Sequence, residues 1–327
     1  MKAAVLFAAL VGLGSSAALA QAPGQTSSLT PTFHSSAALV ALNVTVQDRS
    51  AKFVRDLQPA DFVVYEDGVK QHVEFFESAR VPVDLIVMLD TSASMRRRMA
   101  LVHEAASGFL RTLREGDRGA VVSFATGVDV LQPLTSDQSA LQQAVRGTSA
   151  AGDTSLNTAI YITLKDFGMA AEREGDVRRQ AIVVLSDGAD TSSAIGFDDV
   201  IDLARRTGVS IYTVSLQSGE MRDAVVSSRR FETDAADNTM KTLARETGAQ
   251  AFFPTEDKLK TVYAAIASEL ASQYSIGYVP VNPAPDGTFR HVNVQIVTRP
   301  QLFSRTRLGY IAGAVSPLPL GRRLGGE

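Results

Sequence analysis

Three hard oxygen donors stand at alternate positions in one short segment of the chain. Residues 89–95 read Leu-Asp-Thr-Ser-Ala-Ser-Met, which places a carboxylate at Asp90 and hydroxyls at Ser92 and Ser94. Oxygen donors of this kind suit Mg²⁺, Mn²⁺ or Ca²⁺ better than a soft metal. The segment follows an apolar run and precedes a helical pattern, which is where open α/β sheets bind their ligands. It therefore predicts a divalent-cation site.

Two other segments offer oxygen donors at equivalent positions. Thr154 lies in the sequence Gly-Asp-Thr-Ser at 152–155, before a second helical pattern, and can lend a hydroxyl. Asp187 lies in Leu-Ser-Asp-Gly at 185–188, after another apolar run, and can lend a second carboxylate. Loops at the carboxyl ends of parallel strands share one edge of the sheet, so we expect the three loops to converge on one ion. The predicted metal-binding residues are Asp90, Ser92, Ser94, Thr154 and Asp187.

Two alternatives to a metal site remain for these residues. Asp90 and Ser92 could simply cap a helix, since Asp and Ser are both good N-cap residues. Capping would leave the matching donors at Thr154 and Asp187 without an explanation. A site that has lost its metal is the second alternative, but every predicted position keeps an oxygen donor. We therefore favour a site that binds an ion.

Apolar runs alternate with amphipathic helical patterns between residues 80 and 272. The runs are typical of strands buried on both faces of a mostly parallel sheet, and they lie at 83–89, 120–124, 181–185, 211–216 and 251–253. Apolar residues three and four apart indicate helices at 99–113, 156–167 and 259–270. This alternation predicts an α/β fold with a doubly wound, mostly parallel sheet flanked by helices.

Both flanks of this α/β region show strand patterns. In 37–79, alternation from Val40 to Val46 indicates one strand, and strands at 62–65 and 69–76 are joined by the hairpin signal Glu-Asp-Gly. In 273–312, strands are expected at 274–279 and around 292–296. We expect the two flanks to form one small β-rich domain into which the α/β domain is inserted.

Both ends of the chain differ in composition from the rest of the sequence. Residues 1–20 combine Lys2, an apolar run and a final Ala-Leu-Ala, which predicts a secretory signal peptide cleaved after Ala20. A membrane anchor is the alternative, but the run is shorter than the roughly 20 residues that a span needs. Residues 21–36 are expected to be a flexible leader and 313–327 a disordered tail. The mature protein is expected to be exported, periplasmic or extracellular, and soluble, with no stable membrane span.

Composition excludes several classes of function. The 327 residues carry a formal net charge of -3, which argues against a dedicated nucleic-acid binder. The chain has no Cys, which excludes disulfides, thiolate metal sites and a cysteine nucleophile. Its 4 His residues are scattered, so a histidine metal site is not expected.

Other charged segments have two interpretations each. Arg96, Arg97 and Arg98 follow the metal loop and are either a basic rim that attracts an acidic partner or a solvated first helical turn. Residues 218–238 interrupt the alternation as either a partner-recognition loop or a mobile insertion. Surface charges or helix caps are expected at Asp190, Asp198 and Asp199.

The three donor segments together resemble the metal-ion-dependent adhesion site of von Willebrand factor type A domains. The likeness covers about residues 80–272 and rests on the Asp-Thr-Ser-Ala-Ser run at 90–94, on Thr154, and on Ser-Asp-Gly at 186–188. It implies that Ser92, Ser94 and Thr154 bind Mg²⁺, or Mn²⁺ or Ca²⁺, directly. It implies that Asp90 and Asp187 act through bound water, and that a partner's Asp or Glu fills an open position on the ion.

The flanks resemble a narrower group, the exported von Willebrand factor A-related proteins of Acidobacteria. The likeness spans about 37–311 and includes Tyr-Glu-Asp-Gly at 65–68 and Gly-Tyr-Val-Pro at 277–280. It implies export and fold more than mechanism.

These observations predict a binding protein rather than an enzyme. We expect an exported protein that binds a divalent cation and mediates protein–protein interaction or adhesion through an acidic group of its partner. The alternatives are a metal-dependent hydrolase and a structural subunit of an envelope assembly. No Gly-x-Ser-x-Gly elbow, phosphate-binding Gly-rich loop or suggestive His–Asp pair supports catalysis.

Overall fold

The computed structural model describes residues 39–78, 81–174, 178–187, 190–216 and 227–313. The predicted signal peptide and leader lie outside these residues, as does the predicted tail after Gly313. Gly188, beside the predicted metal residue Asp187, also lies outside them.

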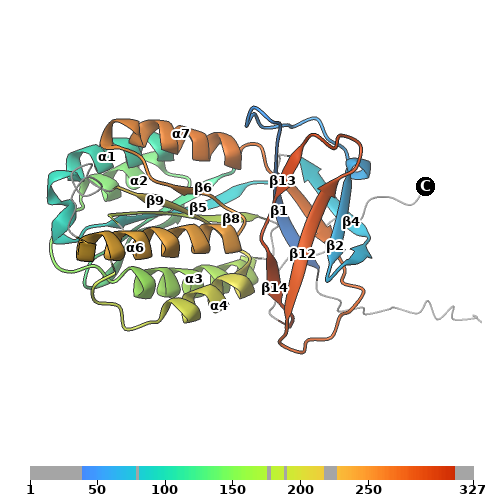
Figure 1. The fold of residues 1–327 in the computed structure, drawn as a ribbon. Helices are drawn as coiled ribbons and strands as arrows, with labels where there is room; N and C mark the ends of the chain where they lie inside the picture. Colours follow the sequence, from blue (N-terminus) through green and yellow to red (C-terminus); the bar gives the residue numbers. More distant parts are fainter. Residues whose placement is uncertain (1–38, 79–80, 175–177, 188–189, 217–226, 314–327) are drawn as a thin grey trace, which may run out of the picture. The chain divides into compact units, whose positions relative to one another are not determined.

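A six-stranded sheet forms the centre of the α/β part (Figure 1). Its strands are β5 (Val83–Asp90), β6 (Arg118–Phe124), β7 (Val128–Thr135), β8 (Arg179–Ser186), β9 (Ser210–Ser215) and β10 (Ala251–Phe252). They follow the order β10-β9-β8-β5-β6-β7, and all neighbours pair in parallel except β6 and β7. The expected mostly parallel α/β fold is confirmed.

Helices cover both faces of this sheet (Figure 1). One face carries α1 (Met99–Leu110), α2 (Gln138–Arg146) and α7 (Leu259–Leu270), and the other carries α3 (Leu156–Glu174), α4 (Phe197–Thr207) and α6 (Ser227–Glu246). Because successive side chains of a strand point to opposite faces, β5 contributes to both cores. Leu85 and Val87 pack on the α1 side, whereas Ile86 and Met88 pack on the α3 side.

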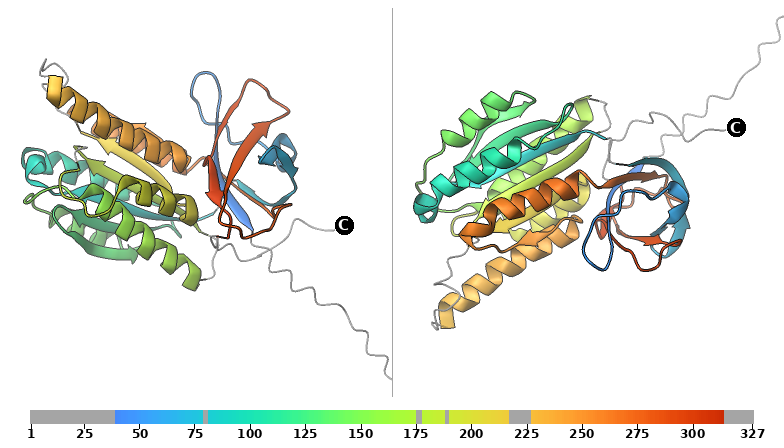
Figure 2. Two further views of the ribbon diagram at one scale, coloured as in Figure 1. Left: turned by 60° about the horizontal axis from the view of Figure 1, so that its bottom comes forward. Right: turned by 90° about the horizontal axis from the view of Figure 1, so that it is seen from above.

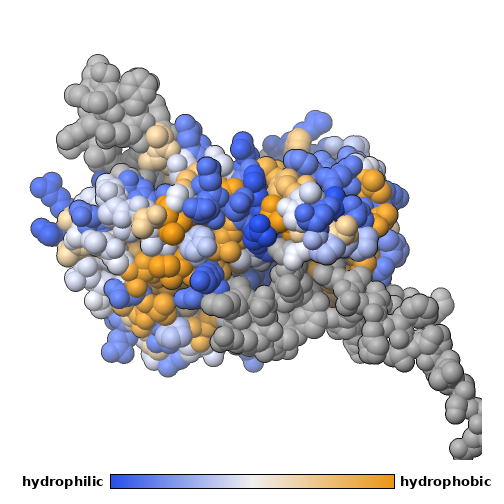
Figure 3. All heavy atoms as spheres, turned by 90° about the horizontal axis from the view of Figure 1, so that it is seen from below, coloured by the Kyte–Doolittle hydropathy of each residue, from blue (hydrophilic) through white to orange (hydrophobic). Residues whose placement is uncertain are grey.

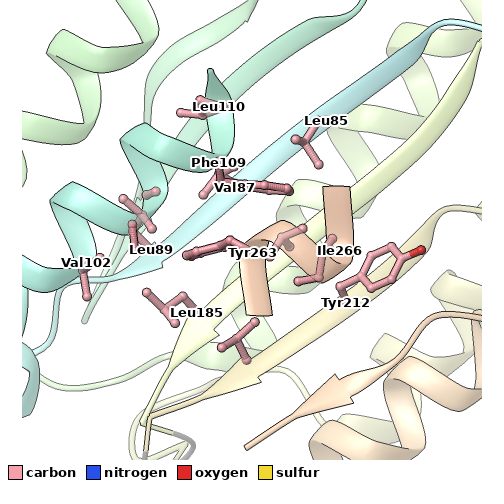
Figure 4. Close-up of a cluster of buried hydrophobic side chains, with 14 of the residues drawn as sticks. Leu85, Val87, Leu89, Val102, Phe109, Leu110, Leu185, Tyr212, Tyr263 and Ile266 are labelled. Atoms are coloured by element: carbon pink, nitrogen blue, oxygen red, sulfur yellow. The ribbon is translucent and has the colours of Figure 1, made fainter. Parts of the chain in front are cut away.

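Tight packing between β5, α1 and α7 fixes the strand that ends at Asp90 (Figure 4). Phe109 of α1 and Tyr263 of α7 stack with ring centroids 4.8 Å apart, and both are almost fully buried. Burying one large apolar side chain is worth about 1.5–3 kcal/mol. The start of the predicted metal loop therefore lies on a rigid support.

The β-rich part consists of two four-stranded sheets, whose strands come from both ends of the chain (Figure 2). The sheet β13-β1-β11-β4 contains β13 (Phe303–Arg305), β1 (Val40–Gln47), β11 (Tyr274–Tyr278) and β4 (Val73–Ser78). The sheet β14-β12-β2-β3 contains β14 (Gly309–Ile311), β12 (Phe289–Ile296), β2 (Phe62–Glu66) and β3 (Val69–Gln71). The two sheets share one core. The boundaries 37–79, 80–272 and 273–312 stay predictions.

The pairings in both sheets join residues that are far apart in the sequence. Leu42 pairs with Ile276, and Val64 pairs with Val294, both in antiparallel register. Each alternating strand presents its apolar side chains to the shared core, as the alternation in the sequence indicates.

The expected single strand at 69–76 is wrong. The strand is interrupted at His72, so that β3 pairs with β2 in one sheet and β4 pairs with β11 in the other. The turn before β3 has positive φ at Asp67 (48°) and Gly68 (80°), as a two-residue hairpin requires. The predicted hairpin is therefore confirmed, and the wrong part of the prediction is that one strand continues from Val69 to Phe76.

The interpretation of 218–238 as a loop or insertion is wrong for its second part. Residues 227–238 belong to the helix α6, and 218–226 lie outside the described residues. The apolar residues Met240 and Leu243 that anchor α6 in the core lie only in its later turns. The first turns therefore carry little of the apolar pattern that predicts a helix.

The strand β7 is an antiparallel edge strand that the apolar pattern did not indicate. Its exposed side chains include Val130 (55% exposed) and Leu131 (39%), and Pro133 lies within it, as is common at sheet edges. Figure 3 shows that apolar side chains also gather on one face of the molecule. Within the described residues, no helix is both long and apolar enough to span a membrane.

Glu269 near the end of α7 connects the α/β part to the β-rich part. It is 2% exposed and accepts hydrogen bonds from the hydroxyls of Tyr212 at 2.7 Å and Thr45 at 3.3 Å. Arg305 Nη2 lies 2.6 Å from Glu269 Oε1 in an ion pair. These partners come from β9, β1 and β13, so one buried carboxylate links three distant strands.

We predict that Glu269→Ala lowers the free energy of unfolding by about 1–3 kcal/mol, because it leaves the buried hydroxyl of Tyr212 without its acceptor and Arg305, whose side chain is 30% exposed, without its counter-ion. Glu104→Ala is a matched control, since Glu104 pairs with Lys260 at 2.5 Å but both side chains are more than half exposed. We expect the control to cost less than about 1 kcal/mol. Urea unfolding measures both losses, and equal losses would contradict the role given to Glu269.

Candidate metal centre

Asp90, the last residue of β5, is the buried centre of the candidate site. It has 0% exposure, and its Oδ1 accepts a hydrogen bond from the Ser92 N–H at 2.8 Å. Its Oδ2 accepts a hydrogen bond from the hydroxyl of Ser186 at 2.5 Å. Ser186 ends β8, so this contact joins the carboxyl ends of two neighbouring parallel strands.

Burial raises the pKa of Asp90 above its usual value. The hydroxyls of Ser186 and Ser92 and the N–H of Ser92 oppose this rise, and the nearby charge of Asp187 adds to it. An ionised carboxylate in such a place is stabilised by a positive charge.

The hydroxyls of Ser92 and Ser94 lie 2.9 Å apart beside this carboxylate. Ser92 is 2% exposed and occupies the N-cap position of the short helix η2 (Ala93–Arg97), but its side chain makes no capping hydrogen bond. Ser94 is exposed. The main helix α1 begins only after Arg98, so the capping alternative does not account for the Ser92 hydroxyl.

The Ser hydroxyls of two other Asp-x-Ser segments, Ser155 and Ser192, contact each other at 2.8 Å. Three further Asp-x-Ser or Asp-x-Thr segments differ from Asp90 and Ser92. They are Asp48 with Ser50, Asp137 with Ser139, and Asp286 with Thr288. In each of them, the hydroxyl donates to the carboxylate two residues earlier at 2.7 Å. In the metal loop the hydroxyl of Ser92 also acts on Asp90, but the short hydroxyl contact of Asp90 comes from Ser186, and the hydroxyl of Ser92 lies 2.9 Å from that of Ser94. The loop thus groups two hydroxyls as a pair.

Backbone hydrogen bonds hold the loop before α3 against the metal loop. The Ala93 N–H donates to the Gly152 carbonyl at 2.9 Å, and the Ala151 N–H donates to the Thr91 carbonyl at 2.7 Å. Asp153 N–H donates to the hydroxyl of Thr126, which follows β6, at 3.0 Å. The structure therefore brings the segment with Thr154 to the edge that holds Asp90.

Thr154 is 5% exposed and is held by the loop that follows β8. Its N–H donates to the hydroxyl of Thr191 at 3.0 Å, and its carbonyl accepts from the Thr191 N–H at 2.9 Å. Asp190 caps α3, since it accepts a hydrogen bond from the Asn157 N–H at 2.9 Å. The second and third donor segments are thus bound to each other as well.

Asp187 lies just beyond β8, and its side chain is 17% exposed. Arg98 Nη1 is 3.7 Å from Asp187 Oδ2, and Arg98 Nε donates to Glu256 Oε1 at 2.9 Å. Sequence reasoning missed Glu256, which begins the short helix η3 (Glu256–Lys258), as well as Ser186 as the partner of Asp90. Only the position of Ser186 at the end of an apolar run could have indicated it.

The residues at this edge fit a hard divalent cation. They offer a buried carboxylate, a second carboxylate and several neutral hydroxyls, which are oxygen donors. Within the described residues, no group of three or more His, Asp or Glu side chains could hold a metal. A cation bound here would therefore depend on hydroxyl ligands for much of its coordination.

Comparison with known families identifies the class of protein. A model of the von Willebrand factor type A domain matches residues 84–265, which is more than half of the chain. The chain belongs to the von Willebrand factor type A domain family.

Individual relatives are distant. The chain is 28% identical over 147 residues to an uncharacterized protein of Borreliella burgdorferi, which covers 42% of this chain and 41% of that protein. It is 27% identical over 202 residues to a UPF0353 protein of Mycolicibacterium paratuberculosis, which covers 57% of this chain and 60% of that protein. The matched part thus spans less than two thirds of either relative. The structure is similar to a von Willebrand factor type A protein from Catenulispora acidiphila, with a TM-score of 0.47 and 14% identity over 86% of this chain and 64% of that chain.

We predict that Gly152→Ala destabilises the site. Gly152 has φ of +81°, and an added Cβ would lie 2.7 Å from the Thr126 hydroxyl that accepts the Asp153 N–H. Backbone strain of about 1–2 kcal/mol and overpacking of about 1–3 kcal/mol should add.

Gly68→Ala is the matched control, because Gly68 has φ of +80° with no atom within 4 Å of an added Cβ. We expect it to lose only the strain energy of about 1–2 kcal/mol. Chemical unfolding compares the two variants, and equal losses would show that the Thr126 contact does not matter.

Proposed function

We propose that this chain binds a divalent cation through Ser92, Ser94, Thr154, Asp90 and Asp187, and that the bound ion recognises an acidic group on a partner protein. The observation that carries the proposal is the pair of hydroxyls of Ser92 and Ser94, 2.9 Å apart, beside the fully buried carboxylate of Asp90. Neither hydroxyl is explained by helix capping.

The chemistry of the donors supports an acidic partner. Ser92, Ser94 and Thr154 would bind the ion directly, and Asp90 and Asp187 would act through water. Neutral hydroxyls leave much of a bound cation's charge uncompensated, and the ion would then attract a carboxylate from outside. The exposure of Ser94 leaves one side of the loop accessible to such a group. Mg²⁺ is the ion we favour, with Mn²⁺ or Ca²⁺ as alternatives.

We propose protein–protein interaction or adhesion as the role of this site, in a protein exported to the periplasm or beyond the cell. The family assignment supports the fold that carries the site. The Ala-Leu-Ala sequence at 18–20 supports export, and the motifs at 65–68 and 277–280 support a likeness to the exported Acidobacteria proteins. A structural subunit of an envelope assembly would use the same fold without the ion.

A metal-dependent hydrolase is the remaining alternative. Catalysis needs a base or nucleophile placed beside the ion. Arg98, the cation paired with Asp187, also donates a hydrogen bond to Glu256. This pairing gives no support for a general base, and we favour binding over catalysis.

We predict that Mg²⁺ stabilises the protein and that Ser92→Ala abolishes this effect. A ligand at a hundredfold excess over its Kd stabilises the folded state by about 2.7 kcal/mol. Melting curves in EDTA and then in Mg²⁺ should therefore differ by roughly 5 °C for a chain of this size.

Ser139→Ala is the matched control for that measurement, because the Ser139 hydroxyl also belongs to an Asp-x-Ser turn but donates to Asp137 at the start of α2. It should keep the full Mg²⁺ shift. Absence of any shift in the wild-type protein would refute cation binding, and turnover of a generic phosphoester would favour the hydrolase.

A second prediction concerns the partner. Wild-type protein should capture its partner from the envelope fraction of its own organism in Mg²⁺, and EDTA should release it. Asp90→Ala should capture much less, because the ion is lost. A partner held equally well in EDTA would instead support a metal-independent assembly role.

A further inference from the structure

One of the three arginines after the metal loop is turned toward the candidate site. Arg98 Nη1 lies 3.7 Å from Asp187 Oδ2, and its side chain is 14% exposed. Arg96 and Arg97 are exposed to solvent. Arg98 therefore forms an ion pair with Asp187, one of the two carboxylates that we assign to the cation. Of the three arginines, only Arg96 and Arg97 are placed as a basic rim would require.

Two carboxylates share this guanidinium. Glu256 accepts a hydrogen bond from Arg98 Nε at 2.9 Å, and its side chain is 55% exposed. Asp187 is more buried, at 17% exposed, so its attraction to Arg98 is less screened by water. Glu256 thus competes with Asp187 for the guanidinium of Arg98.

We propose that Arg98 competes with the divalent cation for Asp187 and thereby sets the cation concentration at which the site fills. This inference rests on the proposed function. An approaching cation meets a carboxylate that is already paired and a positive charge close by, and both lower its affinity. One unit charge roughly 7 Å from a divalent ion changes its affinity by about tenfold in a water-exposed site.

Substitutions of Arg98 and of Glu256 should change the affinity for Mg²⁺ in opposite directions. Arg98→Gln removes the competitor, so the affinity for Mg²⁺ should rise by about tenfold. Glu256→Gln removes one of the two carboxylates that contact Arg98. Arg98 then pairs more strongly with Asp187, so the affinity for Mg²⁺ should fall.

A double variant separates this competition from a general effect of charge. Loss of the Glu256 charge alone would weaken cation binding whether or not Arg98 is present. If Glu256 acts through Arg98, Glu256→Gln should have little effect in the Arg98→Gln background. Equal effects of Glu256→Gln in both backgrounds would overturn the coupling between the two residues.

The test is calorimetric titration of the protein with MgCl₂, using wild type, Arg98→Gln, Glu256→Gln, the double variant and Arg97→Gln. Arg97→Gln is the matched control, because it removes an exposed arginine next to Arg98, and its affinity should stay within about threefold of wild type. Melting curves in EDTA establish that each variant folds.

The outcomes distinguish this inference from the proposed function. Wild-type protein that binds no Mg²⁺ refutes the proposed function itself. Wild-type protein that binds Mg²⁺, with unchanged or weaker binding in Arg98→Gln, overturns the competition and leaves the metal site standing. Should Arg98→Gln fail to fold, Glu256→Gln carries the test, since an unchanged or higher affinity contradicts the proposal.

Discussion

The buried carboxylate of Asp90 is the constraint on which the candidate site depends. A fully buried carboxylate such as that of Asp90 needs hydrogen bonds or a counter-ion, because the transfer of its charge from water into the protein interior is costly. Ser186 and the N–H of Ser92 supply hydrogen bonds and thereby fix the ends of β5 and β8 relative to each other. The remaining need for positive charge supports the proposed cation site. Arg98, which pairs with the neighbouring Asp187, is the proposed competitor of that cation.

The fold and the choice of loops follow from features that the sequence shows directly. β5 is buried along its whole length and β8 at every position except Gln180, so continuous apolar runs reveal both strands. In a mostly parallel sheet, the loops after such runs share one edge. The sequence alone therefore predicts that Asp90 and Asp187 lie at the same edge of the sheet. Thr154 follows no strand, and only its position before the helix α3 indicated it; hydrogen bonds with Thr191 hold it there.

Other features depend on contacts that no local pattern encodes. The break at His72 arises because β3 and β4 pair with different partners, while the apolar residues run on through both strands. The pairing of Arg98 with Glu256 joins residues 158 positions apart and depends on the conformation of two loops. The sequence shows the charge of Arg98 but not that Arg98 faces the site, because exposed and inward-facing arginines look alike in a sequence.

The most direct test of the metal site is a crystal structure of the protein grown with Mn²⁺, examined for anomalous scattering. We predict one strong peak within bonding distance of the hydroxyls of Ser92 and Ser94, with Asp90 close enough to contact the ion through water. The same crystals of Ser92→Ala should lack this peak. A map of the wild-type protein with no peak at this edge of the sheet, in crystals saturated with Mn²⁺, would contradict the account.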